Sequence, residues 1–205
     1  MERKNLLKKS NINVLNLFRR NPFLSKTIRG ISLDLGKPYP EVHASVKELE
    51  AAGMLKIKNV GRSSLCEINL SQEGMTILAF LDEQEALSKK VPNMDKVMGF
   101  REYLDDIVIV TGSYAKGSQT KQSDIELVVI TRDNVINKQS LIENQTSLFL
   151  PPFHPVAISY QDFLGMLLNK EENYGKEIFR NRLIFRNAKR YYEIVKEAIE
   201  NGYKG

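Results

Sequence analysis

Two apolar segments in the second half of the chain constrain its fold more than any other feature. Residues 106–111 (DIVIVT) form a continuous run rich in β-branched side chains, which is typical of a strand buried on both faces. Residues 124–130 (DIELVVI) alternate strictly between the two faces of a strand, so Asp124 and Glu126 point the same way. The chain is therefore expected to form a β-sheet here, with two carboxylates at the start of one strand.

The segment between these strands predicts a phosphate-binding turn. Gly112 and Ser113 follow the first strand, where a glycine lets backbone amides approach phosphate oxygens and a serine hydroxyl adds a donor. Paired carboxylates at the edge of a core are unfavourable unless a cation binds them, and Mg²⁺ prefers carboxylate and phosphate oxygens. We therefore predict that Gly112 and Ser113 bind an NTP, and that Asp124 and Glu126 bind Mg²⁺ and are the catalytic residues. Lys116 is a further candidate for nucleotide binding, with a solvated loop position as the alternative.

The sequence VTGSYAKGSQTKQSDIELVVI (110–130) resembles the signature of the DNA polymerase beta-like nucleotidyltransferase superfamily, and is most similar to its small prokaryotic members. That signature is an apolar strand, Gly-Ser, about ten further residues, and then Asp-apolar-Asp/Glu-apolar. The resemblance implies a nucleotidyltransferase fold, which is a mixed β-sheet with flanking helices. It also implies Mg²⁺-dependent transfer of a nucleoside monophosphate to a hydroxyl, with a protein as one option for acceptor or partner.

Two departures from the family pattern leave the activity open. The second carboxylate is Glu126 rather than the commoner Asp, and the next expected strand, residues 155–160, carries none of the acidic residues that active members place there. Asp162 fits better as the first-turn acid of a helix capped by Ser159, and Asp133 is a weak substitute. Either the domain is an active transferase, or it is catalytically impaired and serves a transcriptional regulator as a nucleotide sensor or dimer platform.

The first part of the chain predicts helices followed by a hairpin. Helices are expected over 11–20, 25–35 (capped by Ser25), about 40–52 and about 71–89, and strands over 54–58 and 64–70. The segment LGKPYPEVHASVKELEAAGMLKIKNVGRSSLCEINLS (35–71) also resembles winged helix-turn-helix regulators. The expected organisation is thus an α/β two-domain chain, with a winged helix-turn-helix domain and trailing helix over 1–92 and a nucleotidyltransferase-like domain over 93–205.

This second resemblance implies duplex DNA as a partner. In such modules the second helix of the pair enters the major groove and the hairpin contacts the backbone. The residues placed at DNA in this way are Lys37, Tyr39, His43, Lys47 and Arg62, with Arg19, Arg20 and Lys26 as further phosphate contacts. Binding of this type usually requires two-fold symmetry, so a homodimer is expected. A winged helix that serves only protein interaction is the alternative.

Charge and composition agree with these expectations without deciding between them. Residues 1–70 hold 13 Lys and Arg against 6 Asp and Glu, whereas the remainder holds 17 against 19. This basic excess suits either a polyanion or a solvated surface. The single cysteine and two histidines favour neither a disulfide nor a zinc site, and no apolar run is long enough to cross a membrane. A cytoplasmic protein is expected.

Overall fold

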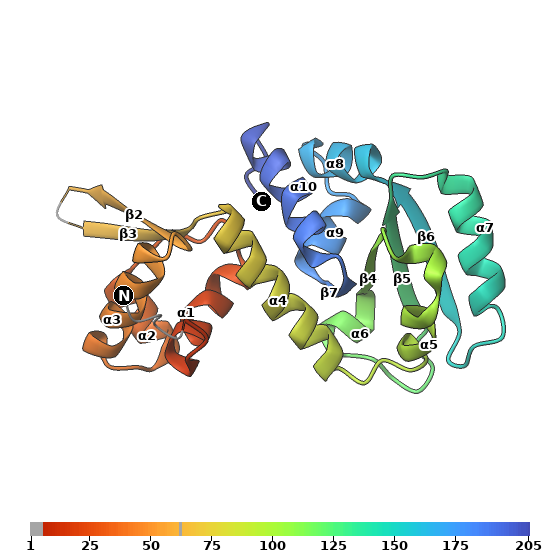
Figure 1. Ribbon diagram of the computed structural model, residues 1–205, viewed down its shortest axis with the longest axis horizontal. Coiled ribbons are helices and arrows are strands. Elements are labelled where there is room, and N and C mark those ends of the chain that lie inside the picture. The colour runs from red at the N-terminus through yellow and green to blue at the C-terminus, as the bar shows by residue number, and fades with distance from the viewer. Residues whose placement is uncertain (1–5, 62) are drawn as a thin grey trace. The chain divides into compact units, whose positions relative to one another are not determined.

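The computed structural model describes residues 6–61 and 63–205, which form two compact units (Figure 1). One unit extends to Leu81 and the other runs from Asp82 to the end of the chain. Helix α4 (Gln72–Ser88) contains the boundary between them. The expected domain boundary after residue 92 remains a prediction. No helix among the described residues is long and apolar enough to cross a membrane.

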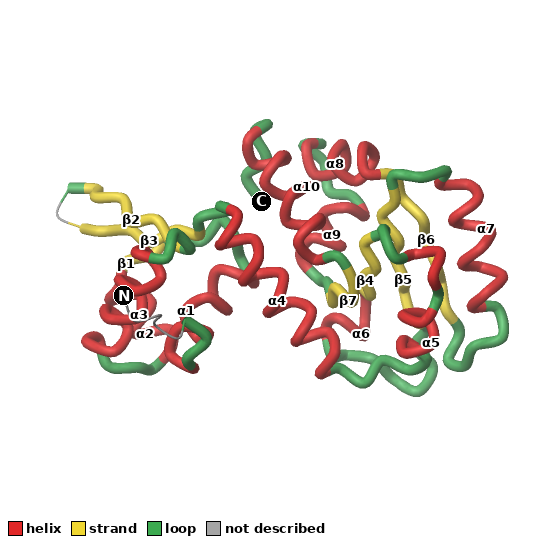
Figure 2. The backbone as a smooth tube through the Cα atoms, viewed as in Figure 1, coloured by secondary structure: helices red, strands yellow, loops and turns green. Residues whose placement is uncertain are grey.

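The N-terminal unit combines three helices with a small antiparallel sheet (Figure 2). Its elements are α1 (Lys9–Arg20), β1 (Lys26–Thr27), α2 (Ile28–Leu35), α3 (Tyr39–Ala51), β2 (Leu55–Val60) and β3 (Ser63–Ile68), with strand order β1-β3-β2. In α3, Val42, Val46 and Leu49 are buried because their spacing places them on one face of the helix. The predicted helices and hairpin of this region are confirmed.

The start of α2 differs from the sequence-based expectation. We expected Ser25 to cap this helix, but the cap is Thr27, whose Oγ1 accepts a hydrogen bond from the Gly30 amide at 3.0 Å. The expectation was wrong because the two residues before the helix, Lys26 and Thr27, form β1 and pair with β3. The end of α2 is as expected, since Gly36 adopts the left-handed conformation with φ of +58°.

The C-terminal unit is built on a mixed four-stranded sheet of order β6-β5-β4-β7. Its strands are β4 (Ile107–Thr111), β5 (Ile125–Thr131), β6 (Phe153–Ser159) and β7 (Leu183–Arg186). Its other elements are α5 (Met94–Gly99), η1 (Arg101–Tyr103), α6 (Gly112–Lys116), α7 (Val135–Thr146), α8 (Tyr160–Leu168), α9 (Tyr174–Arg180) and α10 (Ala188–Glu200). Strand β4 runs antiparallel to both β5 and β7, and β5 runs parallel to β6 through the crossover helix α7.

Both faces of this sheet are covered by helices. On one face, Val108, Val110 and Leu127 belong to a core cluster that also contains Val97 of α5 and Ile142 of α7. Helices α8 and α10 pack on each other and contact strands of the sheet. This arrangement explains why residues 107–110 are all apolar, since every residue of β4 is buried.

A buried charged cluster ties the last part of α4 to the sheet. The Tyr192 hydroxyl donates to Oδ2 of Asp82 at 2.5 Å, and Nη2 of Arg182 lies 3.7 Å from the same oxygen. The side chains of Asp82 and Arg182 are each 5% exposed. Because buried charges are costly unless they are paired, this cluster holds α4 to the loop before β7 and to α10.

Candidate nucleotide site and N-terminal groove

The end of β4 passes directly into a turn at Gly112. This glycine has a φ of +66°, a left-handed conformation that L side chains adopt only with strain. Thr111, the last residue of β4, donates through Oγ1 to the carbonyl of Asn181 at 2.5 Å. This hydrogen bond ties the residue before the turn to Asn181, the C-cap residue of α9.

The Glu126 carboxylate lies directly against this turn. Glu126 is the second residue of β5 and pairs in register with Thr111. A Cβ atom built on Gly112 would lie 2.0 Å from Oε1 and 2.5 Å from Cδ of Glu126. The Glu126 carboxylate therefore occupies the space that a side chain at position 112 would need.

Asp124 is engaged by a histidine from the neighbouring strand. It precedes β5, and its Oδ2 lies 3.0 Å from Nε2 of His154. His154 is the register partner of Glu126 on the parallel strand β6. Both side chains of the pair are accessible, with 42% of the Asp124 side chain and 65% of the His154 side chain exposed. The sequence did not single out His154, because this contact depends on the pairing of strands that are far apart in the chain.

Strand β6, on which the family resemblance implies a third acid, carries no carboxylate side chain. The side chains of β6 that share a face with Glu126 are His154, Val156 and Ile158. Ser159 caps α8 as expected, accepting from the Asp162 amide at 2.9 Å and donating to Oδ2 of Asp162 at 2.6 Å. The structural role expected for Asp162 is confirmed.

Helix α9 adds two residues to the edge of the site. Glu177 forms an ion pair with Lys116, with Oε1 and Nζ 3.0 Å apart. The pKa of Tyr174 is raised to about 12, first by burial and then by the negative charges of Glu126 and Glu177. Lys116 is thus neutralised within the protein, and a phosphate would have to compete with Glu177 for it. Sequence reasoning did not identify Tyr174 or Glu177, because α9 reaches the site only through tertiary packing.

The available donors fit a divalent cation that is shared with a phosphate. Among residues 6–61 and 63–205 there is no cluster of three Asp, Glu, His or Cys side chains that could hold a metal ion. Asp124 and Glu126 nevertheless offer two carboxylates beside a turn whose glycine leaves the backbone open to close approach. Mg²⁺ is commonly held by one or two carboxylates with water and substrate phosphates completing its coordination, so this donor set suits it.

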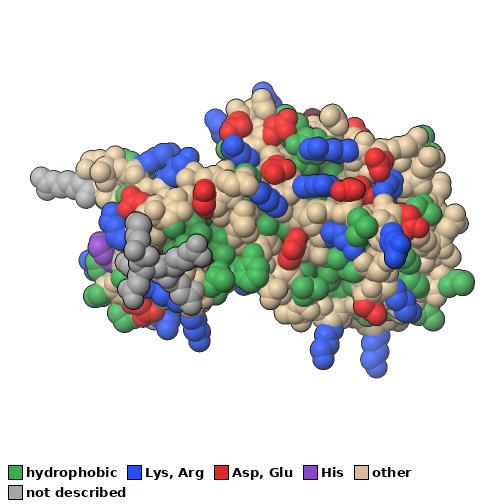
Figure 3. Space-filling model, viewed as in Figure 1, with side chains coloured by type: hydrophobic (Ala, Val, Ile, Leu, Met, Phe, Trp, Pro, Cys, Tyr) green, Lys and Arg blue, Asp and Glu red, His purple; other side chains and the backbone are tan. Residues whose placement is uncertain are grey.

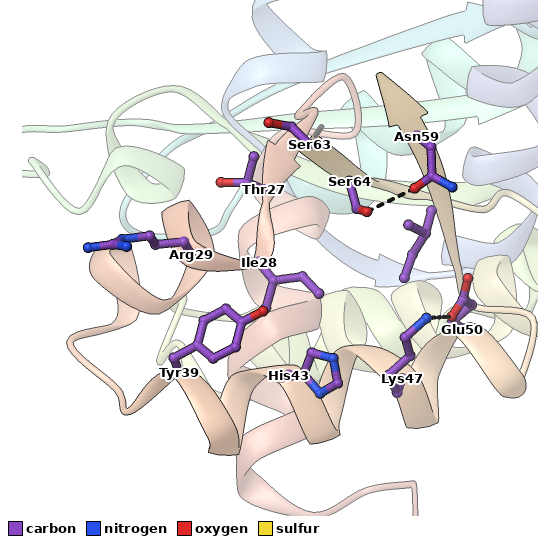
Figure 4. A pocket seen from close by; sticks show the side chains of 11 residues that line it. Thr27, Ile28, Arg29, Tyr39, His43, Lys47, Glu50, Asn59, Ser63 and Ser64 are labelled. Carbon is purple, nitrogen blue, oxygen red and sulfur yellow. Dashed lines mark hydrogen bonds and ion pairs between the residues drawn. The ribbon is translucent and has the colours of Figure 1, made fainter. Parts of the chain in front are cut away.

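The N-terminal unit has a polar groove of about 530 Å³ between its helices and its hairpin (Figure 4). Of the expected DNA contacts, Tyr39, His43 and Lys47 line it along α3. The ring centroids of Tyr39 and His43 are 5.8 Å apart. Nζ of Lys47 pairs with Oε2 of Glu50 at 2.8 Å, so this lysine is partly neutralised. The groove therefore presents aromatic and polar groups along one exposed side of α3.

Residues from other elements complete this groove. Arg29 of α2 is exposed and lies beside Tyr39, while Asn59 and Ser64 line the hairpin side (Figure 4). The Ser64 hydroxyl donates to Oδ1 of Asn59 at 2.8 Å. None of these three was identified from the sequence, because β2 and β3 approach α2 and α3 only in the folded unit.

The remaining expected DNA contacts have different outcomes. Lys37 is exposed just before α3, and Arg62 lies outside the described residues. The expectation for Arg19 was wrong, since it is only 5% exposed and its Nε donates to Oδ1 of Asn16 at 3.0 Å. Arg19 lies on the packed side of α1, whereas Arg20 is exposed. Lys26 is paired with Asp34.

Comparison with protein families identifies the domain type of the C-terminal unit. Residues 93–199, which are more than half of the chain, match the model of the nucleotidyltransferase domain. No curated protein matches the chain, and no solved structure does. The family match covers the turn at Gly112, both carboxylates and the strands that position them. It begins after the N-terminal unit and so carries no information on the groove. The chain belongs to the nucleotidyltransferase domain family.

Proposed function

We propose that the C-terminal unit binds a nucleoside triphosphate with Mg²⁺ at Gly112 and transfers the nucleoside monophosphate to a hydroxyl acceptor. The observation that carries this proposal is the contact between Glu126 and Gly112, with 2.0 Å between Oε1 and a Cβ built on the glycine. In this proposal Glu126 binds the metal beside a turn whose glycine allows backbone amides to approach phosphate oxygens closely. Family membership supports the same reaction class.

The residues divide into two roles in this proposal. Gly112 and Ser113 bind the phosphates of the leaving group through backbone amides and the serine hydroxyl. Asp124 and Glu126 hold the metal, which when bound neutralises charge on the phosphates during displacement. Lys116 contacts phosphate only after leaving Glu177, so its contribution is smaller than that of the turn.

A second function, a regulator with a catalytically impaired nucleotidyltransferase domain, has one specific observation in its favour. The positions on β6 that face the site are His154, Val156 and Ile158, and none supplies a carboxylate. Such a domain would bind the NTP as a sensor, or support a homodimer, without efficient transfer. The two functions share one nucleotide site and differ in turnover.

We further propose that the N-terminal unit is a winged helix that binds duplex DNA. Its support is the groove along α3, with Arg29, Tyr39 and His43 exposed on one side, together with the basic excess of residues 1–70. Over the C-terminal unit, acidic and basic side chains are mixed on the face shown in Figure 3. The basic excess is therefore not a property of the whole surface. A homodimer in the cytoplasm, with domains over 1–92 and 93–205, completes this proposal.

The experiment that tests the transferase uses two labels and one pair of variants. The protein is incubated with Mg²⁺ and each NTP labelled at the α- or the γ-phosphate, and retention of label on protein or on added hydroxyl compounds is measured. Transfer of the α-label only, lost in Asp124→Asn and kept in the exposed control Asp95→Asn, supports the enzyme. Mg²⁺-dependent NTP binding with no transfer supports the sensor. Absence of NTP binding contradicts both.

A further inference from the structure

A second groove of the C-terminal unit lies between β6 and α8 and has a volume of about 520 Å³. Its floor is apolar, formed by Val156 and Ile158 of β6 and Met166 of α8. Its rim is polar, with Gln161, Asp162 and Asn169 exposed along the helix and its end. The arrangement of an apolar floor and a few polar groups is typical of sites for small organic groups.

This groove adjoins the nucleotide site. Tyr174 lines the groove, and Val156 and Ile158 of its lining lie on the same face of the sheet as Glu126. The sheet order places β4 with the Gly112 turn, then β5 with Glu126, and then β6 with the groove. Neighbouring strands are about 4.8 Å apart, so the groove begins roughly one strand beyond the carboxylates.

The order of these strands indicates the side from which a hydroxyl would attack the α-phosphate. In an in-line reaction at the α-phosphate, the attacking oxygen approaches opposite the leaving pyrophosphate. In the proposed function, the turn at Gly112 holds the leaving group on the β4 side of Glu126. The attacking hydroxyl must then come from the β6 side, where the groove lies.

The charges around the groove indicate which acceptors it accommodates. Among the described residues that line it there is no Lys or Arg, and the charged side chain is Asp162. A nucleic acid end or another phosphorylated acceptor would meet a carboxylate and find no cation in the groove, which is unfavourable. A neutral or cationic hydroxyl compound would find an apolar floor and amide groups at the rim.

A side chain of α7 covers part of the outer edge of β6. Gln139 of α7 donates through Nε2 to the Pro155 carbonyl at 2.9 Å and accepts from the Ala157 amide at 2.6 Å. Two backbone groups of this edge are therefore engaged by a side chain and are not free to pair with an added strand. This contact favours approach of an acceptor over the face of β6, through the groove, rather than pairing along its edge.

We propose that the groove between β6 and α8 binds the acceptor of the transfer reaction, and that it selects a hydroxyl compound that carries no phosphate. This inference rests on the proposed function of the same site. The acceptor oxygen forms a bond to the α-phosphorus, the bond from that phosphorus to the bridging oxygen breaks, pyrophosphate leaves, and the hydroxyl proton passes to water. Met166 and Val156 contact the apolar part of the acceptor, and Gln161 and Asn169 contact its polar groups.

Gly165 allows the groove to be filled without touching the nucleotide site. It lies on α8 in the groove lining, and a Cβ built on it meets no atom within 4 Å. Gly165→Phe therefore adds a ring to open space and removes a helix-destabilising glycine. Gly99→Phe is the matched control, because Gly99 is also exposed with no atom within 4 Å of a built Cβ and lies on α5.

The test measures NTP binding and α-label transfer for the wild type and both variants. The acceptor probes are glycerol, a neutral peptide containing Ser, Thr and Tyr, and a single-stranded oligoribonucleotide with a free 3′-hydroxyl. We expect transfer to glycerol or the peptide, which separates a polyol from a protein hydroxyl, and none to the oligonucleotide. We also expect Gly165→Phe to reduce transfer at least tenfold with an unchanged Kd for the NTP, and Gly99→Phe to match the wild type.

Four results would overturn the inference. They are preferred labelling of the oligonucleotide, transfer that Gly165→Phe leaves unchanged, NTP binding that this variant weakens tenfold, and NTP binding with none of the three probes labelled. The third result would place the nucleotide itself in the groove. If the wild type binds no NTP, the proposed function itself fails. If the wild type binds NTP but one of the four results above is found, only the acceptor site fails.

Discussion

Gly112 and Glu126 are in direct contact, and the carboxylate occupies the space that any side chain at position 112 would need. The built Cβ of Gly112 lies 2.0 Å from Oε1 and 3.1 Å from Oε2 of Glu126. Gly112 is the first residue of α6, directly after β4, and Glu126 is the second residue of β5. A substitution at position 112 is therefore expected to change the candidate nucleotide site more than it changes the stability of the fold.

Gly112→Ala is expected to abolish NTP binding while the protein remains folded. The alanine must adopt a φ of +66° and displace the end of the Glu126 side chain, which is flexible, so the free energy of unfolding falls by about 1–2 kcal/mol. Gly117→Ala is the matched control, because Gly117 has a φ of +70° but no atom within 4 Å of a built Cβ. Denaturant unfolding should show similar losses for the two variants, and equilibrium binding should show loss of NTP for Gly112→Ala only. Equal NTP affinity in both would contradict the role of the contact.

His154→Asp is expected to raise turnover. It places a carboxylate on β6 at the register position of Glu126, on the strand where the family's third acid is missing here. A positioned base contributes about 10²–10⁴-fold, so pyrophosphate release from a Mg²⁺-bound NTP should rise at least tenfold. His154→Asn is the matched control, with the same shape and no charge, and should give no increase. If both variants release pyrophosphate at the wild-type rate, the absence of a third acid does not limit the reaction.

Arg29→Ala is expected to weaken binding of duplex DNA. Arg29 is exposed at the groove of the N-terminal unit, and loss of one phosphate contact should lower affinity for all sequences and reduce the salt dependence by about one ion. Fluorescence anisotropy at several salt concentrations measures both effects. Arg101→Ala, at an exposed position of the C-terminal unit, is the control and should bind as the wild type does. DNA binding that is equal in the two variants, or absent in the wild type, would contradict the assignment.

The stability of the protein is expected to fall above about pH 10. Burial, and then the charge of Asp82, raise the pKa of Tyr192 well above its ordinary value of 10.0. The protonated Tyr192 hydroxyl therefore contributes fully to the free energy of unfolding below pH 10. Above that pH the unfolded state ionises, and for one tyrosine the free energy of unfolding falls by about 1.4 kcal/mol at pH 11. Unfolding in denaturant between pH 9 and 11 should show a smaller decline for Tyr192→Phe. Tyr39→Phe, at an exposed ring, should keep the wild-type decline. An equal decline in all three proteins would contradict this account.

Helices and strands with a clear repeat of apolar residues were predictable from the sequence. Very short strands, and a helix with few buried residues, were not. The strands β4 and β5 and the helix α3 were expected close to their observed bounds, because their apolar residues follow the pattern that each element requires. Helix α7 was missed since only Ile142 and Thr146 of its residues are buried, which leaves little pattern. The four residues of β7 and the two of β1 were missed because strands this short are defined by their partners.

The candidate site was predictable only where it is local in sequence. Gly112 and Glu126 lie within one motif, so their contact follows from a strand, a turn and a second strand. His154 and Tyr174 join them through the pairing of β6 with β5 and the packing of α9, which no local pattern encodes. The same reason explains Arg19, whose burial depends on how α1 packs within its unit.

The most direct test of the central claim is the Mg²⁺ dependence of NTP affinity in Glu126→Gln. Equilibrium binding of each NTP is measured with Mg²⁺ and with EDTA, beside the control Glu193→Gln at an exposed position of α10. The account predicts binding that requires Mg²⁺, weakens at least tenfold in Glu126→Gln and is unchanged in Glu193→Gln, with all three proteins equally stable. Binding by Glu126→Gln that matches the wild type in both affinity and Mg²⁺ dependence would contradict it.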